Sequence, residues 1–177
     1  MDPVIANASS FVLACVFAGA ALHKWRHAGE FRQVLADYRI APAVSVATLA
    51  WLLPVTESVA AAGLIVPATR LPAAGLSIVL LLVYSVAIGI NLLRGRRMLD
   101  CGCGGPRQSL SEWLLLRNAV LVILACAAGA DRIERQPGLL DWGITLLATA
   151  AGVLCYLAVN QLLANSDALN LPRGNHA

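Results

Sequence analysis

Long apolar stretches dominate the chain and are separated by short polar segments. Residues 3–22, 71–93 and 142–166 contain no Asp, Glu, Lys or Arg, which gives charge-free runs of 20, 23 and 25 residues. A helix that crosses the roughly 30 Å hydrocarbon core of a bilayer needs about 20 mostly apolar residues. Hydropathy and helix-breaking residues together predict five membrane-spanning helices. These helices are expected at residues 4–22, 44–66, 72–93, 110–129 and 139–163.

The predicted fold class is all-α, a polytopic membrane helical bundle. Residues 1–164 are expected to form a single transmembrane domain, followed by a polar C-terminal tail at residues 165–177. Between the first two spans, Phe31–Tyr38 carries apolar residues at spacings of three and four, which is typical of a short amphipathic helix at the membrane surface. Ser109 and Glu112 have the spacing of a capping box and predict the start of the fourth span.

The composition excludes a soluble protein. Of the 177 residues, 59% are hydrophobic and 13% are charged, and the mean hydropathy is +0.73. A soluble domain has about 45–50% apolar and about 25% charged residues. The net charge of +3 is spread over loops rather than gathered on one face, so no nucleic-acid partner is expected. The expected surroundings are the lipid bilayer.

A close cysteine pair lies in the glycine-rich segment Asp100–Pro106, here called the cysteine segment. Cys101 and Cys103 are separated by one glycine, and a disulfide between them needs a sharply bent backbone, which glycines allow. Strained, exposed disulfides have the more oxidising potentials typical of redox-active pairs, and nearby arginines favour the reactive thiolate. The motif predicts a redox pair, with metal ligation or no chemical role as the alternatives.

Two predicted spans are interrupted by a charged residue well inside their ends, where it is costly in hydrocarbon unless the charge is paired or hydrated. Glu57 follows the helix-distorting Pro54 by three residues, and Arg117 is followed by Asn118. Glu57 and Arg117 are expected either to pair with each other as a structural lock or to form a polar site that contacts a substrate or cofactor. Lys24 closes the first span, and its position alone predicts an anchor whose amine extends to the membrane surface.

Three further cysteines, Cys15, Cys126 and Cys155, lie inside predicted spans. Single cysteines in such positions usually act as small buried hydrophobic residues. Cys15 and Cys155 lie at similar predicted depths, so an alternative is that they meet as a second, relaying pair.

These features together resemble the MauE family of methylamine-utilisation membrane proteins, within the wider DoxX-like group. The resemblance covers about residues 4–130 and implies a four-helix core with an added fifth C-terminal helix, in the bacterial cytoplasmic membrane. The residues that carry it are Lys24, the segment Phe31–Tyr38, Pro54-x-x-Glu57, Asp100-Cys101-Gly102-Cys103-Gly104 and Arg117-Asn118.

The resemblance implies a role in disulfide handling. MauE-like proteins are linked to maturation of the disulfide-rich small subunit of periplasmic methylamine dehydrogenase, alongside a thioredoxin-like partner. The implied function is therefore a thiol–disulfide maturation factor for an exported client, and enzymatic turnover as an oxidoreductase is left open. A membrane quinone is one candidate electron carrier. The residues carried over are the redox pair Cys101 and Cys103, and an intramembrane polar cluster of Lys24, Glu57, Arg117 and Asn118.

Two other functions remain as alternatives. In one, Cys101 and Cys103 bind a soft ion such as Cu(I) together with His23 or His27, although two Met and three His in the whole chain provide no evident entry path. No metal site is assigned on this basis. In the other, the protein is a non-catalytic membrane scaffold or chaperone and the cysteines are incidental.

Charge distribution and chemistry predict opposite membrane orientations. The first and third loops and the C-terminal tail carry nine Lys and Arg residues, whereas the opposite face carries three. The positive-inside rule places the nine in the cytoplasm. Disulfides, however, form outside the cytoplasm. On that chemical ground the loop with Cys101 and Cys103 is assigned to the periplasmic side.

Overall fold

The computed structural model describes residues 2–40, 42–96, 99, 110–130 and 138–170. Cys101 and Cys103 lie outside the described residues. Apart from short connections, the described chain is helical, and five of its helices are long and apolar enough to cross a membrane. In chain order the elements are α1 (Pro3–Arg26), α2 (Ala28–Tyr38), α3 (Ala43–Ile65), the 3-10 helix η1 (Pro67–Thr69), α4 (Arg70–Leu93), α5 (Glu112–Gly129) and α6 (Leu139–Asn170).

The five predicted spans and the amphipathic helix are confirmed, although several of their boundaries differ from the predicted ones. Helix α5 begins at Glu112 with Ser111 at its N-cap position, so the capping box predicted from Ser109 is wrong. Glu112 instead occupies the first turn, where a negative charge favours the helix N-terminus. Helix α6 continues to Asn170, through the first residues of the predicted polar tail, and Gln161 donates to Asn165 one turn later, at 3.3 Å.

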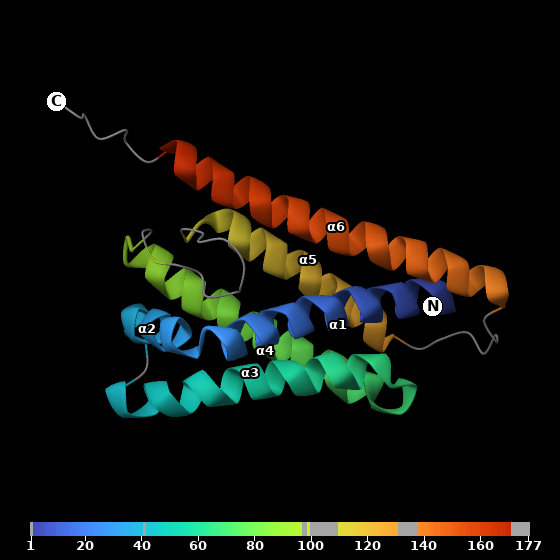
Figure 1. Ribbon diagram of the computed structural model, residues 1–177, viewed down its shortest axis with the longest axis horizontal. Helices are drawn as coiled ribbons and strands as arrows, with labels where there is room; N and C mark the ends of the chain where they lie inside the picture. The colour runs from blue at the N-terminus through green and yellow to red at the C-terminus, as the bar shows by residue number, and fades with distance from the viewer. Residues whose placement is uncertain (1, 41, 97–98, 100–109, 131–137, 171–177) are drawn as a thin grey trace.

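Four helices form a closed bundle, and the last one packs on its outside. Helix α1 packs against α3, α3 against α4, α4 against α5, and α5 against α1 (Figure 1). Helix α6 packs mainly along α1. This is the predicted four-helix core with a fifth C-terminal membrane helix, so the protein is an all-α polytopic membrane bundle.

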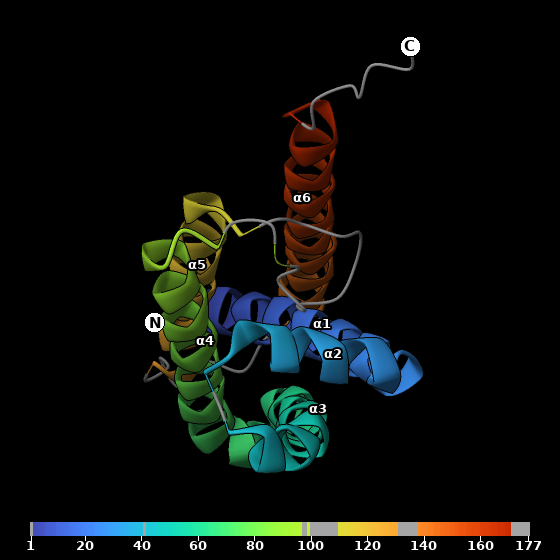
Figure 2. The ribbon, with the colours of Figure 1, turned by 90° about the vertical axis from the view of Figure 1, so that its left-hand side faces the viewer.

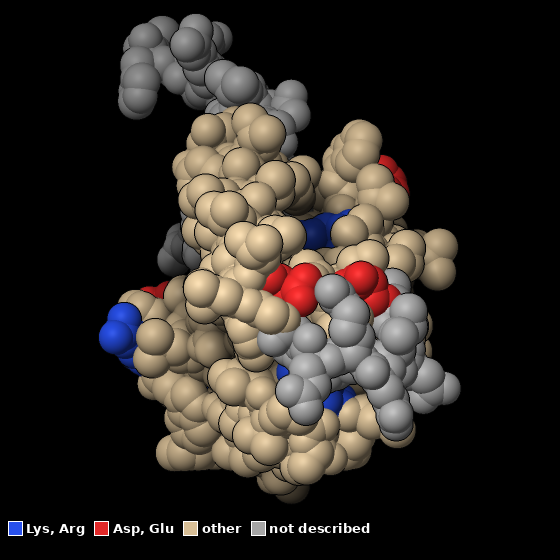
Figure 3. All heavy atoms as spheres, turned by 90° about the vertical axis from the view of Figure 1, so that its right-hand side faces the viewer, with Lys and Arg blue, Asp and Glu red and all other residues tan. Residues whose placement is uncertain are grey.

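The core lies between α1, α3, α4 and α5. Its largest buried side chains include Leu13, Phe17, Leu64, Leu80 and Leu121. Many other large apolar side chains are exposed on the outside of the helices, and neutral residues form most of the surface at the end shown in Figure 3. In a chain with five membrane-spanning helices, these outer side chains face lipid rather than water.

Helix α2 lies at the end of the bundle where α1 ends (Figure 2). Phe31 and Tyr38 turn inwards and are buried. Tyr38 packs with Ile88 of α4 and with Leu110 and Leu114 at the start of α5. We call this second apolar group the end cluster; residues such as Leu92, Leu99 and Leu163 pack around it.

The end cluster holds both flanks of the cysteine segment. Leu99 precedes that segment directly, Leu110 follows it, and both belong to the end cluster or pack against it. Two arginines attach the end of α4 to α2, because Arg94 donates to the Arg39 carbonyl at 3.3 Å and Arg96 donates to the Asp37 carbonyl at 2.9 Å. The described residues on the two sides of 100–109, Leu99 and Leu110, therefore both lie at the end cluster together with Tyr38 of α2.

The short connection between α3 and α4, which contains η1, lies at the opposite end of the bundle (Figure 1). The side chain of Thr69 donates to the Gly63 carbonyl at 3.1 Å. Arg70 is buried and donates to the Leu64 carbonyl at 3.3 Å and to Asn7 of α1 at 2.7 Å. These bonds satisfy carbonyls that the end of α3 would otherwise leave open.

Candidate functional site

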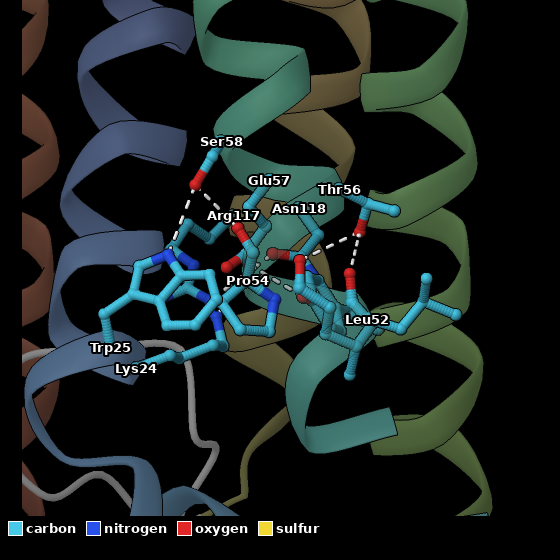
Figure 4. Close-up of polar contacts among 11 residues, drawn as sticks. Lys24, Trp25, Leu52, Pro54, Thr56, Glu57, Ser58, Arg117 and Asn118 are labelled. Atoms are coloured by element: carbon cyan, nitrogen blue, oxygen red, sulfur yellow. Dashed lines mark hydrogen bonds and ion pairs between the residues drawn. The ribbon is translucent and has the colours of Figure 1, made fainter. Parts of the chain in front are cut away.

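A buried ion pair joins α1 to α3. The Lys24 amine lies 2.6 Å from Glu57 Oε1, and the two side chains are each only 1% exposed (Figure 4). The Tyr84 hydroxyl of α4 donates to the same carboxylate oxygen at 2.7 Å. The amine also lies over the rings of Phe31 and Tyr84, 5.2 and 5.3 Å from their centres. Charge, hydrogen bond and ring faces together compensate the cost of burying the ammonium.

Lys24 does not extend to the membrane surface, so the predicted anchor is wrong. Because α2 folds back over the end of α1, Phe31 covers the amine, and the Glu57 carboxylate supplies the counter-charge that solvent would otherwise provide. The next residue, Trp25, is exposed instead, and its indole N–H donates to the Ser58 hydroxyl of α3 at 3.4 Å.

Helix α3 supports this pair without a break at its proline. Pro54 is fully buried, and α3 continues through it as one helix. The Ser58 hydroxyl donates to the Pro54 carbonyl at 2.7 Å. Glu57, which follows Pro54 by about one turn, contacts Lys24 and Tyr84.

A second polar group connects α5 to α4 and α6. The Arg117 guanidinium, 9% exposed, donates to Asn160 Oδ1 at 2.8 Å and to Asn118 Oδ1 at 3.4 Å. It also lies over the Tyr156 ring, 5.8 Å from the ring centre. The Asn118 amide donates to the Ser85 hydroxyl of α4 at 3.2 Å.

Two adjacent residues of α4 link the polar group around Glu57 to the polar group around Arg117. Tyr84 contacts Glu57, and the next residue, Ser85, contacts Asn118. Glu57 forms an ion pair with Lys24, whereas the structural-lock alternative expected Arg117 as its partner. The long, flexible lysine stem reaches the carboxylate from the last turn of α1, whereas the guanidinium is held by side-chain amides.

The structure thus brings Lys24, Glu57, Arg117 and Asn118 into adjoining contacts in the bundle. The uncharged partners Tyr84, Ser85, Tyr156 and Asn160 were missed by the sequence analysis, which followed charges. All four lie inside the charge-free runs 71–93 and 142–166. Polar side chains within those runs were the available signal, because a buried hydroxyl or amide also needs a partner in an apolar interior.

The cysteines in the spans differ from their prediction. Cys15, Cys126 and Cys155 are exposed on the outside of the helices and are free thiols. They are therefore not buried in the bundle, and the alternative relaying pair of Cys15 with Cys155 is not formed. A small, weakly polar thiol is tolerated at a lipid-facing position.

Two histidines at the end of α1 lie close together. The rings of His23 and His27 are 4.8 Å apart, centre to centre. Within the described residues, no three His, Cys, Asp or Glu side chains are grouped so that they could hold a metal ion. The described site is thus a set of hydrogen-bond donors and one compensated ion pair, suited to fixing helix ends and to contacting a polar group within the bilayer.

Comparison with known proteins identifies the family. The family model "Methylamine utilisation protein MauE" matches residues 2–131. Methylamine utilization protein MauE of Paracoccus denitrificans is 41% identical over 165 residues, covering 92% of this chain and 89% of that protein. Its namesake from Methylophilus methylotrophus is 34% identical over 181 residues, covering 98% and 95%. No solved structure matches the chain. With a family model spanning four helices of the core and relatives aligned along nearly the whole length, this chain belongs to the MauE family of methylamine utilisation proteins.

Proposed function

We propose that this protein is a membrane thiol–disulfide maturation factor that supports disulfide formation in an exported protein during methylamine utilisation. The observation that carries the proposal is the Cys101-Gly102-Cys103 motif between flanks that the end cluster anchors. Because Leu99 and Leu110 both lie at the end cluster, the chain between them begins and ends at the same end of the bundle. Membership of the MauE family supports the same function.

The proposed chemistry is a dithiol–disulfide exchange. A thiolate of a reduced thioredoxin-like partner attacks one sulfur of the Cys101–Cys103 disulfide and forms a mixed disulfide. The second thiol of the partner then displaces the bound cysteine. Two electrons and two protons pass to Cys101 and Cys103, and the partner leaves with a disulfide that it transfers to the client. A disulfide-rich subunit such as that of methylamine dehydrogenase is a client of the expected class.

The intramembrane polar groups act as positioning residues in this proposal. The pair of Lys24 and Glu57 ties α1 to α3, and Arg117 ties α5 to α6 through Asn160. The hydrogen bond from Asn118 to Ser85 ties α5 to α4, the two helices between which the cysteine segment lies in the sequence. The redox pair then works from a rigid base.

We place the cysteine segment on the periplasmic side of the bacterial inner membrane. Disulfides persist there and not in the cytoplasm. Two of the arginines that oppose this orientation have structural tasks, since Arg94 and Arg96 donate to backbone carbonyls at the end of α2. Their positions are explained by these bonds, which reduces their weight as orientation signals.

The test is to trap the mixed disulfide in cells. In a Cys103→Ser variant and a Cys101→Ser variant, the remaining thiolate can attack the disulfide of the oxidised partner, which is the reverse of the exchange above. The second cysteine of the segment, which would complete that reverse reaction and release the partner, is absent. We expect one of the two to accumulate a disulfide-linked adduct that mass spectrometry identifies as a protein with a thioredoxin-type Cys-x-x-Cys site, and that reductant dissolves.

Two controls make the trap specific. A Cys126→Ser variant keeps both cysteines of the segment and should form no more adduct than the unaltered protein. The Cys101→Ser/Cys103→Ser variant should form none and should leave the client without its disulfides. Absence of an adduct in both single variants, with normal client maturation in the double variant, would rule the proposal out and favour a non-catalytic scaffold.

A further inference from the structure

A long groove runs between α5 and α6 over the surface of α1. Its volume is about 770 Å³, and its walls are almost entirely apolar. Trp113, Leu116 and Ile144 line it and are more than half exposed, so it is open along its side. Because α5 and α6 both span the membrane, that side opens onto hydrocarbon. An occupant therefore enters from the bilayer and carries a long apolar chain.

One end of the groove is polar and lies towards the end cluster. Arg117 and Tyr156 belong to the lining, and Arg117 lies about 7–8 Å inwards from the first residue of α5 at 1.5 Å per residue. Leu163 lines the same end and also packs against the end cluster. The polar end of the groove thus reaches the cluster that anchors the cysteine segment.

The chemistry of this end favours a neutral head group with acceptor oxygens. The Arg117 guanidinium can only donate hydrogen bonds, and the contacts seen for it are the neutral amide oxygens of Asn160 and Asn118. A phosphate head group would have to leave the aqueous surface and lose its hydration to reach this depth. A flat ring with carbonyl oxygens accepts from a guanidinium and can stack beside Tyr156 without that cost.

We propose that the groove between α1, α5 and α6 binds an isoprenoid quinone, with its ring at Arg117 and Tyr156 and its chain along the apolar walls. The identity of the ring rests on the proposed function, which requires an acceptor for the electrons of the reduced pair. In that step the thiols of Cys101 and Cys103 lose two electrons and two protons and form a disulfide. The quinone accepts the two electrons, its two carbonyl oxygens take up the two protons, and the product is the quinol.

Binding is measured by titrating the purified full-length protein in detergent with decylubiquinone and following tryptophan fluorescence. Val120→Phe and Ala148→Phe fill the groove from opposite walls. Each added phenylalanine ring would occupy space that the quinone needs, so each should weaken binding about tenfold or more. Ile123→Phe is the matched control, because Ile123 is exposed on the same helix as Val120 and does not line the groove. It should bind like the unaltered protein.

Three results would overturn the inference. Unchanged affinity in both groove-filling variants is one, and equal weakening by Ile123→Phe is another. The third is groove-dependent binding of phosphatidylglycerol with no binding of decylubiquinone, which would make the groove a phospholipid site. The Cys101→Ser/Cys103→Ser variant separates this inference from the proposed function. It should bind decylubiquinone normally, and quinone binding without thiol oxidation would refute only the redox function.

Discussion

At the scale of single residues, Lys24 and Glu57 determine whether the last turn of α1 stays against the interior of α3. Their charges are buried together, 2.6 Å apart, and Tyr84 adds a hydrogen bond to the carboxylate. A buried pair of this kind adds little over an apolar contact of the same shape, but removal of one partner leaves the other charge uncompensated. The pair therefore specifies which surfaces meet more than it adds stability.

Because removal of one partner leaves the other charge uncompensated, Glu57→Gln should strongly lower the stability of the fold. The variant keeps the shape of the side chain but removes the counter-charge of Lys24, which should cost about 3–5 kcal/mol and lower the midpoint of thermal unfolding in detergent. The variant Lys24→Met/Glu57→Gln, which removes both charges, should recover most of the loss.

Glu30→Gln is the matched control for that measurement. The substitution removes the same charge as Glu57→Gln, but from a side chain that is 69% exposed. Its carboxylate lies 3.9 Å from His27, and solvent screens that interaction. Its unfolding midpoint should equal that of the unaltered protein. Equal midpoints for Glu57→Gln and Glu30→Gln would contradict a buried, mutually dependent pair.

At the scale of helices, the position of α6 depends on one close approach to α1. A Cβ atom at Gly152 would lie 2.7 Å from Val12 Cγ2, whereas a Cβ at Gly143 of the same helix would meet nothing within 4 Å. The absence of a side chain at residue 152 thus lets α6 lie directly on α1 and form one wall of the groove.

Alanine substitutions at the two glycines should have opposite effects. Gly152→Ala pushes α6 away from α1 and should destabilise the fold by about 1–3 kcal/mol, and a second change, Val12→Ala, should relieve this. Gly143→Ala should be neutral or raise stability by up to about 1 kcal/mol, because alanine favours a helix over glycine. Thermal unfolding measures both, and a Gly152→Ala variant as stable as Gly143→Ala would show that α6 does not pack as described.

Sequence reasoning located the helices well because their signal is local. The charge-free runs 71–93 and 142–166 correspond to α4 and α6, and apolar spacing marked α2. The partners of the buried charges were not predictable in the same way, since Lys24 and Glu57 are 33 residues apart and meet because α1 packs against α3. The contact of Gly152 with Val12 is likewise a property of the packed bundle and not of either helix alone.

At the scale of the whole molecule, the features converge on one end of the bundle. The end cluster anchors both flanks of the cysteine segment, the ion pair fixes α1 to α3, and the polar end of the groove lies beside the same cluster. A partner protein outside the membrane and an electron carrier within it could thus act on the same cysteine pair from two sides.

The central claim is that Cys101 and Cys103 form a redox-active disulfide outside the cytoplasm. It is tested most directly in intact cells, in a variant that keeps only these two cysteines, with a membrane-impermeant maleimide added before and after an impermeant reductant. We predict no labelling before reduction and labelling of both cysteines after it. Full labelling without reductant, or labelling only after the cells are lysed, would contradict the account.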